Sequence, residues 1–239
     1  MTALFALATS LLRGLADFGG GLFTRRIPAL TVVVVSQAAA AVVLGVIVIA
    51  TGGWSEAGPQ LWFAVAAGVV GPVAMPCFYK ALALGPMGVV SPLGSLGVAV
   101  PAAFGFGSVM SLIAEASTTV TGLFLALFVQ RLTNFAVGGT ALFASVRRGA
   151  RALPEEGGSA AVLAALPVLA LIGLADVAAN GTYAITAQHG PVTVAAVLAS
   201  LYPVVTAPAA RGVLKERLRG VQAAGAGLAL VGTVLLATG

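Results

Sequence analysis

The sequence predicts an all-α membrane protein, a polytopic bundle of about eight transmembrane helices built as two inverted repeats. Of its 239 residues, 59% are hydrophobic and only 8% are charged, whereas roughly a quarter of the residues of a soluble domain are charged. The apolar runs between the charges reach the roughly 20 residues that a helix needs to cross a bilayer. One apolar segment with a Gly-Pro turn also recurs later in the chain.

Polar or charged turns separate the expected spans. The first run contains Arg13 and Asp17 and has no basic segment before it, so we expect a retained span and not a signal peptide. In chain order the expected spans are Thr2–Phe23, Ala29–Ala50, Leu61–Leu82, Met87–Ile113, Thr118–Val146, Ala160–Ala187, Pro191–Val213 and Val221–Ala237.

The net charge of +5 does not indicate nucleic-acid binding, because the basic residues form short clusters between apolar runs. Lys and Arg concentrate in the cytoplasmic loops of membrane proteins. Since the odd-numbered loops hold nearly all of them, we expect those loops in the cytoplasm and both termini outside. The basic residues concerned are Arg25, Arg26, Lys80, Arg147, Arg148, Arg151, Arg211, Lys215, Arg217 and Arg219.

The internal repeat relates Gly85–Leu96 to Gly190–Leu201, with roughly half of the positions matching without a gap. Gly68 and Gly173 fall at the same offset. The third and fourth spans therefore correspond to the sixth and seventh, and an odd offset in span number inverts the second copy. Inverted repeats are typical of secondary transporters, whose substrate site lies near the interface between the repeats.

Three segments resemble the EamA family of the drug/metabolite transporter superfamily. They are Phe78–Pro86, then Val197–Thr206, and then Leu214–Leu218, whose Leu-Lys-Glu-Arg-Leu turn is the most recognisable element. The resemblance departs in the first repeat, which lacks this turn and the Gly-rich helix after it. It therefore implies a shortened member that lacks one or two of the usual ten helices, with residues 1–113 as an incomplete first repeat and 114–239 as the second.

The resemblance implies a function as well as a fold. It implies a secondary transporter that moves a small metabolite or drug-like molecule by alternating access, as a multi-pass protein of the plasma (cell inner) membrane and not an enzyme. The alternative is an inactive or partner-dependent membrane scaffold derived from such a transporter. The expected partners are the lipid bilayer, a small-molecule substrate, a coupling proton and a second copy in a homodimer through the small-residue face at Ala223 and Gly227, with no nucleic acid.

Charged side chains inside spans are the first candidates for function, because each costs about 2.5–3.5 kcal/mol on insertion scales. Arg13 and Asp17 lie four residues apart on one helix face. They either line a cavity, where they contact substrate or relay a proton, or form an internal ion pair that only makes membrane insertion tolerable. Arg131 shares a face with Asn134. It either binds an anionic substrate group, pairs with Asp176, or extends to the headgroups.

A polar stripe on the sixth span supplies further candidates. Asp176, Asn180 and Tyr183 recur at helical spacing, so we expect them to face the bundle interior. Asp176 either carries the proton of a proton-coupled cycle or forms a hydrogen bond that only stabilises helix packing. Gln37 lies at a depth similar to that of Arg131, and Tyr202 with the following proline is expected to break the seventh span and expose carbonyl groups.

Other features predict no chemistry. One cysteine and one histidine make a metal site unexpected, and we expect no cofactor. Gly19–Gly21 lacks the strand and lysine of a phosphate loop, so we interpret it as a packing site.

Overall fold

The computed structural model describes residues 2–96, 112, 113, 115, 116, 119–189, 199, 201–215, 220, 223–225, 227, 228, 231 and 235. Within them the chain forms helices and no strands, which confirms the all-α fold class. The elements are α1 (Thr2–Thr24), α2 (Ala29–Thr51), the 3₁₀ helix η1 (Gly53–Glu56), α3 (Leu61–Leu84), α4 (Met87–Leu96), α6 (Val120–Arg147), α7 (Gly158–His189) and α9 (Pro203–Leu214).

Four of the described helices are long and apolar enough to cross a membrane: α2, α3, α6 and α7. Their surfaces carry large hydrophobic side chains that water would disfavour, and hydrocarbon solvates such side chains well. Helix α1 is 23 residues long, the same length as α2. These five helices begin and end within about two residues of the expected spans. The most exposed of these side chains include Val42, Ile49, Val73, Leu163 and Leu171.

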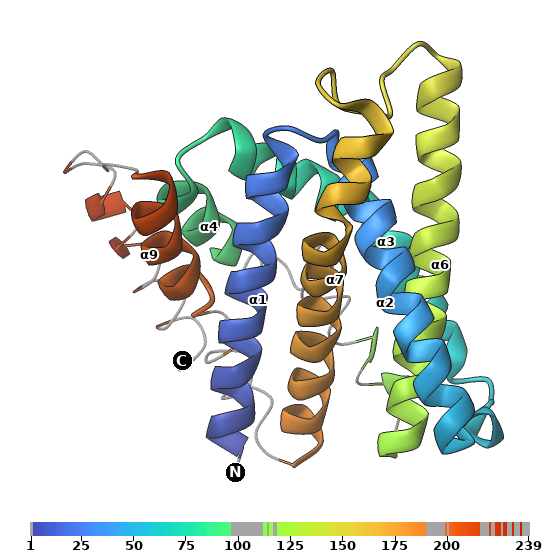
Figure 1. Ribbon diagram of the computed structural model, residues 1–239. Helices are drawn as coiled ribbons and strands as arrows, with labels where there is room; N and C mark the ends of the chain where they lie inside the picture. The colour runs from blue at the N-terminus through green and yellow to red at the C-terminus, as the bar shows by residue number, and fades with distance from the viewer. Residues whose placement is uncertain are drawn as a thin grey trace.

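Helix α1 lies at the centre of the described bundle (Figure 1). It packs on α7 and α3 on one side and on α9 on the other, while α4 packs on α9. Helices α2 and α6 pack on each other, α3 packs on α6, and α7 packs on α2. The buried apolar side chains form two main clusters, one around Tyr79 and Leu169 and one around Leu44 and Leu127.

Glycines allow the closest helix contacts. A Cβ atom added to Gly68 on α3 would lie 2.6 Å from the backbone oxygen of Gln130 on α6. A Cβ atom on Gly173 of α7 would collide with the backbone oxygen of Ser36 on α2. Small residues at such crossings bring helix backbones together in lipid. The Gly19–Gly21 run likewise faces Ile172, Tyr79 and Leu82 in turn, so its interpretation as a packing site is confirmed.

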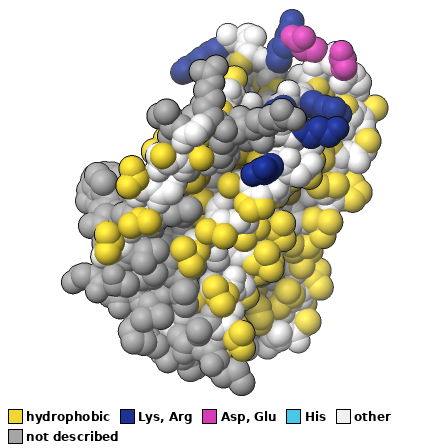
Figure 2. Space-filling view, turned by 90° about the vertical axis from the view of Figure 1, so that its left-hand side faces the viewer, with side chains coloured by type: hydrophobic (Ala, Val, Ile, Leu, Met, Phe, Trp, Pro, Cys, Tyr) yellow, Lys and Arg dark blue, Asp and Glu magenta, His cyan; other side chains and the backbone are white. Residues whose placement is uncertain are grey.

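The basic loops gather at one end of the bundle. Arg25 and Arg26 line one cavity with Glu155 and Glu156, and Lys80 and Arg151 line a neighbouring one with Arg25. Figure 2 shows Lys and Arg at this end and a hydrophobic surface below it. The first, third and fifth loops therefore share one side, as the charge pattern predicts; their cytoplasmic placement stays a prediction.

The later spans are described only in part. Helix α4 is described to Leu96, and the remainder of the expected fourth span lies mostly outside the described residues. Leu201 and Tyr202 form a turn and α9 begins at Pro203, the position of the predicted break, while most of the seventh span before this turn lies outside the described residues. The second Gly-Pro turn, residues 216–219 of the Leu-Lys-Glu-Arg-Leu turn and most of the last span lie outside the described residues.

Candidate functional site

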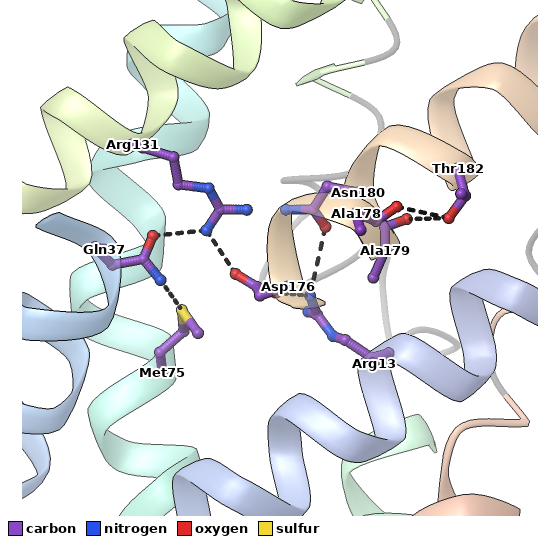
Figure 3. A network of polar contacts seen from close by, with 9 residues as sticks. All are labelled: Arg13, Gln37, Met75, Arg131, Asp176, Ala178, Ala179, Asn180 and Thr182. Atoms are coloured by element: carbon purple, nitrogen blue, oxygen red, sulfur yellow. Dashed lines mark hydrogen bonds and ion pairs between the residues drawn. The ribbon is translucent and has the colours of Figure 1, made fainter. Parts of the chain in front are cut away.

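A single carboxylate, Asp176 on α7, lies between two arginines in the middle of the bundle (Figure 3). Its Oδ1 is 2.6 Å from Nη1 of Arg13 on α1, and its Oδ2 is 2.5 Å from Nη1 of Arg131 on α6. The side chains of all three residues are at most 5% exposed. Two charge-assisted hydrogen bonds thus join three helices through one buried anion.

Neutral polar side chains extend this network to two more helices. Nη1 of Arg131 also donates to Oε1 of Gln37 on α2 at 2.7 Å, and Nε2 of Gln37 donates to the sulfur of Met75 on α3 at 3.7 Å. Oδ1 of Asn180, one turn beyond Asp176, accepts a long bond of 3.4 Å from Arg13. We call the set of Arg13, Gln37, Arg131, Asp176 and Asn180 the central network.

The local sequence places these groups. Asp176 and Asn180 are four residues apart, so both project from one face of α7. Arg131 and Asn134 are three residues apart, which also places them on one face of α6. All four side chains are buried. Gly71 on α3 has no side chain where one would meet the amide of Asn134, so that amide lies directly against α3.

A small cavity adjoins the central network. It is lined by residues of α1, α3, α6 and α7 and measures about 10 Å³, which holds about one water molecule. The site therefore has little free space in this structure. The lining residues are Arg13, Gly71, Ala74, Met75, Gln130, Arg131, Asn134, Asp176 and Asn180.

Several buried polar atoms around this cavity have no hydrogen-bond partner among the described residues. They are Nε and Nη2 of Arg131, Oε1 of Gln130 and Oδ1 of Asn134. Buried polar atoms are nearly always paired, and leaving one unpaired costs about 1–3 kcal/mol, more when it is charged. Such a cluster makes the cavity a candidate place for a bound water or solute.

Asp17 and two tyrosines form the other flank of the site. Asp17 is 3% exposed and interacts electrostatically with Arg13 and Asp176. Tyr79 on α3 is fully buried, its ring lies against Gly20, and its hydroxyl has no partner among the described residues. Tyr202, at the start of α9, is buried and interacts electrostatically with Asp17 and Arg13.

All nine candidate residues from the sequence are buried, and eight of them belong to the central network, the cavity lining or the flank formed by Asp17 and Tyr202. Arg13 interacts electrostatically with Asp17 on its own helix, and its guanidinium also forms an ion pair with Asp176 on α7. The interpretation that Arg131 extends to the headgroups is wrong, because its side chain is buried and paired with Asp176. Tyr183 lies apart, in a small cluster with Ala199.

Sequence reasoning missed three members of the site. Met75 and Tyr79 lie in an apolar run whose periodicity does not mark them, although an apolar span with a tyrosine is a weak signal for a buried hydroxyl. Gln130 directly precedes Arg131, and this adjacency is the signal in the sequence that could have identified it. Within the described residues, no group of three or more His, Cys, Asp or Glu side chains is placed to hold a metal ion.

The comparisons with known proteins give one match. The family described as the EamA-like transporter family matches residues 105–238, which is more than half of the chain. No curated protein and no solved structure shows significant similarity. The match covers α6, α7 and α9, and so includes three of the five residues of the central network.

Proposed function

Since this chain belongs to the EamA-like transporter family, a family of integral membrane transporters, we propose that it is a secondary transporter. It moves a small metabolite or drug-like molecule across the plasma membrane by alternating access. The observation that carries the proposal is the central network: a buried set of charges beside a cavity, where helices from both parts of the chain meet. Buried charge inside a membrane bundle is costly and marks a functional site.

Reciprocal helix contacts support two inverted halves, residues 1–113 and 114–239. Gly68 of the first half receives the backbone of Gln130 from the second, and Gly173 of the second half receives the backbone of Ser36 from the first. The two glycines are equivalent in the repeat. The residues that follow on the two partner helices, Gln37 and Arg131, hydrogen-bond to each other across the same region. Both halves therefore contribute side chains to a site at this interface.

The small volume of the cavity and the ion pair between the halves support a compact state of the cycle with little room for substrate. Asp176 binds Arg13 from the first half and Arg131 from the second, so it joins the halves while the cavity is shut. Because Arg13 and Asp176 belong to different halves, separation of the halves at this point requires their ion pair to lengthen. A substrate that replaces part of the lost interaction lowers the free energy of the open states, since binding shifts a conformational equilibrium only by its differential affinity.

Asp17 is the carboxylate proposed to exchange a proton with the aqueous phases. The two guanidinium groups on Asp176 stabilise its anion. Asp17, in contrast, has one neighbouring cation among the described residues, Arg13, and a neighbouring anion, Asp176. The groups that face Asp17 electrostatically are Arg13 on its own helix, Asp176 on α7, and the hydroxyls of Tyr79 and Tyr202.

Flux through proteoliposomes tests this function. A panel of neutral, cationic and carboxylate solutes is offered to vesicles with an imposed pH gradient, and proton movement is followed with a trapped pH dye. Asp17→Asn should abolish flux driven by the gradient while leaving solute exchange at equal pH. Glu156→Gln makes the same chemical change at an exposed loop position and should transport normally.

Two results would contradict the proposal. If Asp17→Asn and Asp176→Asn both leave gradient-driven flux unchanged, the carboxylates have no role in coupling. If the folded wild-type protein transports no member of the panel, the alternative of an inactive or partner-dependent scaffold is favoured, and purification as an obligate dimer would support it.

A further inference from the structure

We propose that the free edge of Arg131 binds the carboxylate of a small substrate that also carries a hydrogen-bond donor next to that carboxylate. This inference rests on the transport function proposed above and names the substrate class of the same site. Of the three interpretations of Arg131 that the sequence leaves open, burial excludes extension to the headgroups, and the structure allows pairing with Asp176 and binding of an anion at once.

The guanidinium of Arg131 uses only one of its nitrogens within the described network. Nη1 donates to Asp176 at 2.5 Å and to Gln37 at 2.7 Å, whereas Nε and Nη2 are buried without a partner among the described residues. Nε–H and one Nη2–H of an arginine point along the same edge, with the spacing of two carboxylate oxygens. The unpaired edge is therefore a two-pronged site for a planar anion.

The neighbouring atoms indicate what lies beside that anion. Oε1 of Gln130 and Oδ1 of Asn134 are acceptors without a partner among the described residues, and both residues line the cavity with Arg131. In Figure 3 the amide nitrogen of Asn180 points toward Nη2 of Arg131, so two donors face each other with no acceptor drawn between them. A carboxylate supplies acceptors to the donors, and a hydroxyl or ammonium group on the next carbon supplies donors to the acceptors.

Charge balance sets the stoichiometry. The described buried charges around the cavity are Arg13, Arg131, Asp17 and Asp176, which sum to zero when all are ionised. A hydroxy monocarboxylate in the site adds one uncompensated negative charge, which is unfavourable in a low-dielectric interior, whereas an amino acid zwitterion adds none. In the first case, one proton taken up by Asp17 restores neutrality. We therefore expect one proton to accompany each hydroxy monocarboxylate, so that transport moves no net charge.

A bound water is the competing occupant. The cavity of about 10 Å³ fits roughly one water molecule in the closed state. Water has no charge to complement a guanidinium edge and adds nothing to the charge balance, so it predicts no preference for anions. The experiment separates the two by comparing acids with their uncharged amides of nearly the same shape.

The probes are lactate and glycerate with their amides, lactamide and glyceramide. Each is tested for stabilisation of the detergent-purified protein against heat and for counterflow in proteoliposomes, with protein-free vesicles subtracted. The acids should bind and be transported, and the amides should do so at least about tenfold more weakly. Flux of the acids should follow the pH gradient and be indifferent to a potassium-diffusion potential.

Arg131→Lys is the decisive variant, because lysine keeps the charge beside Asp176 and loses the two-pronged edge. It should raise the half-saturating concentration of the acids by about tenfold or more and leave that of the amides unchanged. Arg147→Lys makes the same change at the exposed end of α6 and should alter neither.

Equal binding of acids and amides, or unchanged acid affinity in Arg131→Lys, would overturn the carboxylate assignment in favour of water alone. Acid flux that responds to membrane potential would overturn the one-proton balance. If other solutes of the wider panel are transported and these acids are not, this inference fails while the transport function stands. If the folded protein transports nothing, both fail.

Discussion

Asp176→Asn tests whether one carboxylate holds the centre of the bundle together. At a charge separation of about 4 Å and an effective dielectric constant of about 20, each ion pair contributes roughly 4 kcal/mol of Coulomb attraction before desolvation is subtracted. Removing one partner of a buried ion pair typically costs about 3–5 kcal/mol, because the other charge stays buried. Asparagine removes the anion that both Arg13 and Arg131 contact, while Asp17 stays near Arg13. We therefore expect a loss of at least about 3–5 kcal/mol of unfolding free energy.

Thermal unfolding in detergent measures this loss. For a chain of this size, 1 kcal/mol shifts the unfolding midpoint by about 2–4 °C, so a drop of roughly 6–20 °C is expected. The fluorescence of Trp54, whose ring packs edge-to-face on Phe128 at 5.7 Å between centroids, reports the separation of η1 from α6. Glu156→Gln should leave the midpoint unchanged.

A second variant checks the cause. Arg131→Met removes one of the two cations that contact Asp176, so Asp176→Asn combined with Arg131→Met should be less destabilised than the sum of the two single changes. Such coupling is expected only of groups that interact directly. A midpoint for Asp176→Asn equal to that of the control, or strict additivity in the double variant, would refute the bridging role of Asp176.

Three further predictions concern packing, capping and orientation. Gly173→Ala places a methyl group against the backbone of Ser36 and should destabilise the protein by about 1–3 kcal/mol in thermal unfolding. Thr119→Ala removes the hydroxyl that accepts from the amide of Gly122 at 3.0 Å at the start of α6, and should cost about 1 kcal/mol in the same assay. Arg148→Cys, with the native cysteine removed, should react with a membrane-impermeant maleimide only after cells are permeabilised.

Each of these three predictions has a matched control variant, and the comparison with that control can contradict it. Gly139→Ala meets no atom within 4 Å and should stabilise the exposed helix slightly; an equal loss at both glycines would refute the close-contact argument. Thr140→Ala lies inside α6 and should be nearly neutral. Ser55→Cys lies in the opposite loop and should react in intact cells, and the reverse labelling pattern would invert the predicted orientation.

The sequence predicts the helices well because lipid makes one requirement dominant. Every backbone polar group in hydrocarbon must be satisfied within a helix, so length and apolarity define a span without knowledge of its neighbours. The same reasoning finds the buried residues of the site, because a charge inside a span has to face the bundle interior. This is why Arg13, Arg131 and Asp176 are recognisable as candidates before their contacts are known.

Which groups pair is not readable from the sequence. The spacing of Arg13 and Asp17 is that of an ion pair within one helix, and only the packing of α1 on α7 shows that Arg13 extends to Asp176. The role of Tyr79 is hidden in the same way, because its position depends on Gly20 of another helix. Side-chain partners across helices depend on rotation about each helix axis, which apolar periodicity defines poorly when helices are apolar on all faces.

The repeat predicted from the sequence would place unlike residues at equivalent positions of the site. At the offset that relates Gly68 to Gly173, Gly71 corresponds to Asp176 and Met75 to Asn180. The second half therefore carries most of the polar groups, while the first half supplies space at Gly71. Under the proposed arrangement of halves, a substrate held by Arg131 stays with α6 and α7 as the halves move. Arg13 is then the charge from the first half that has to release Asp176 during opening, so its ion pair, and not the substrate contacts, sets the stability of the closed state.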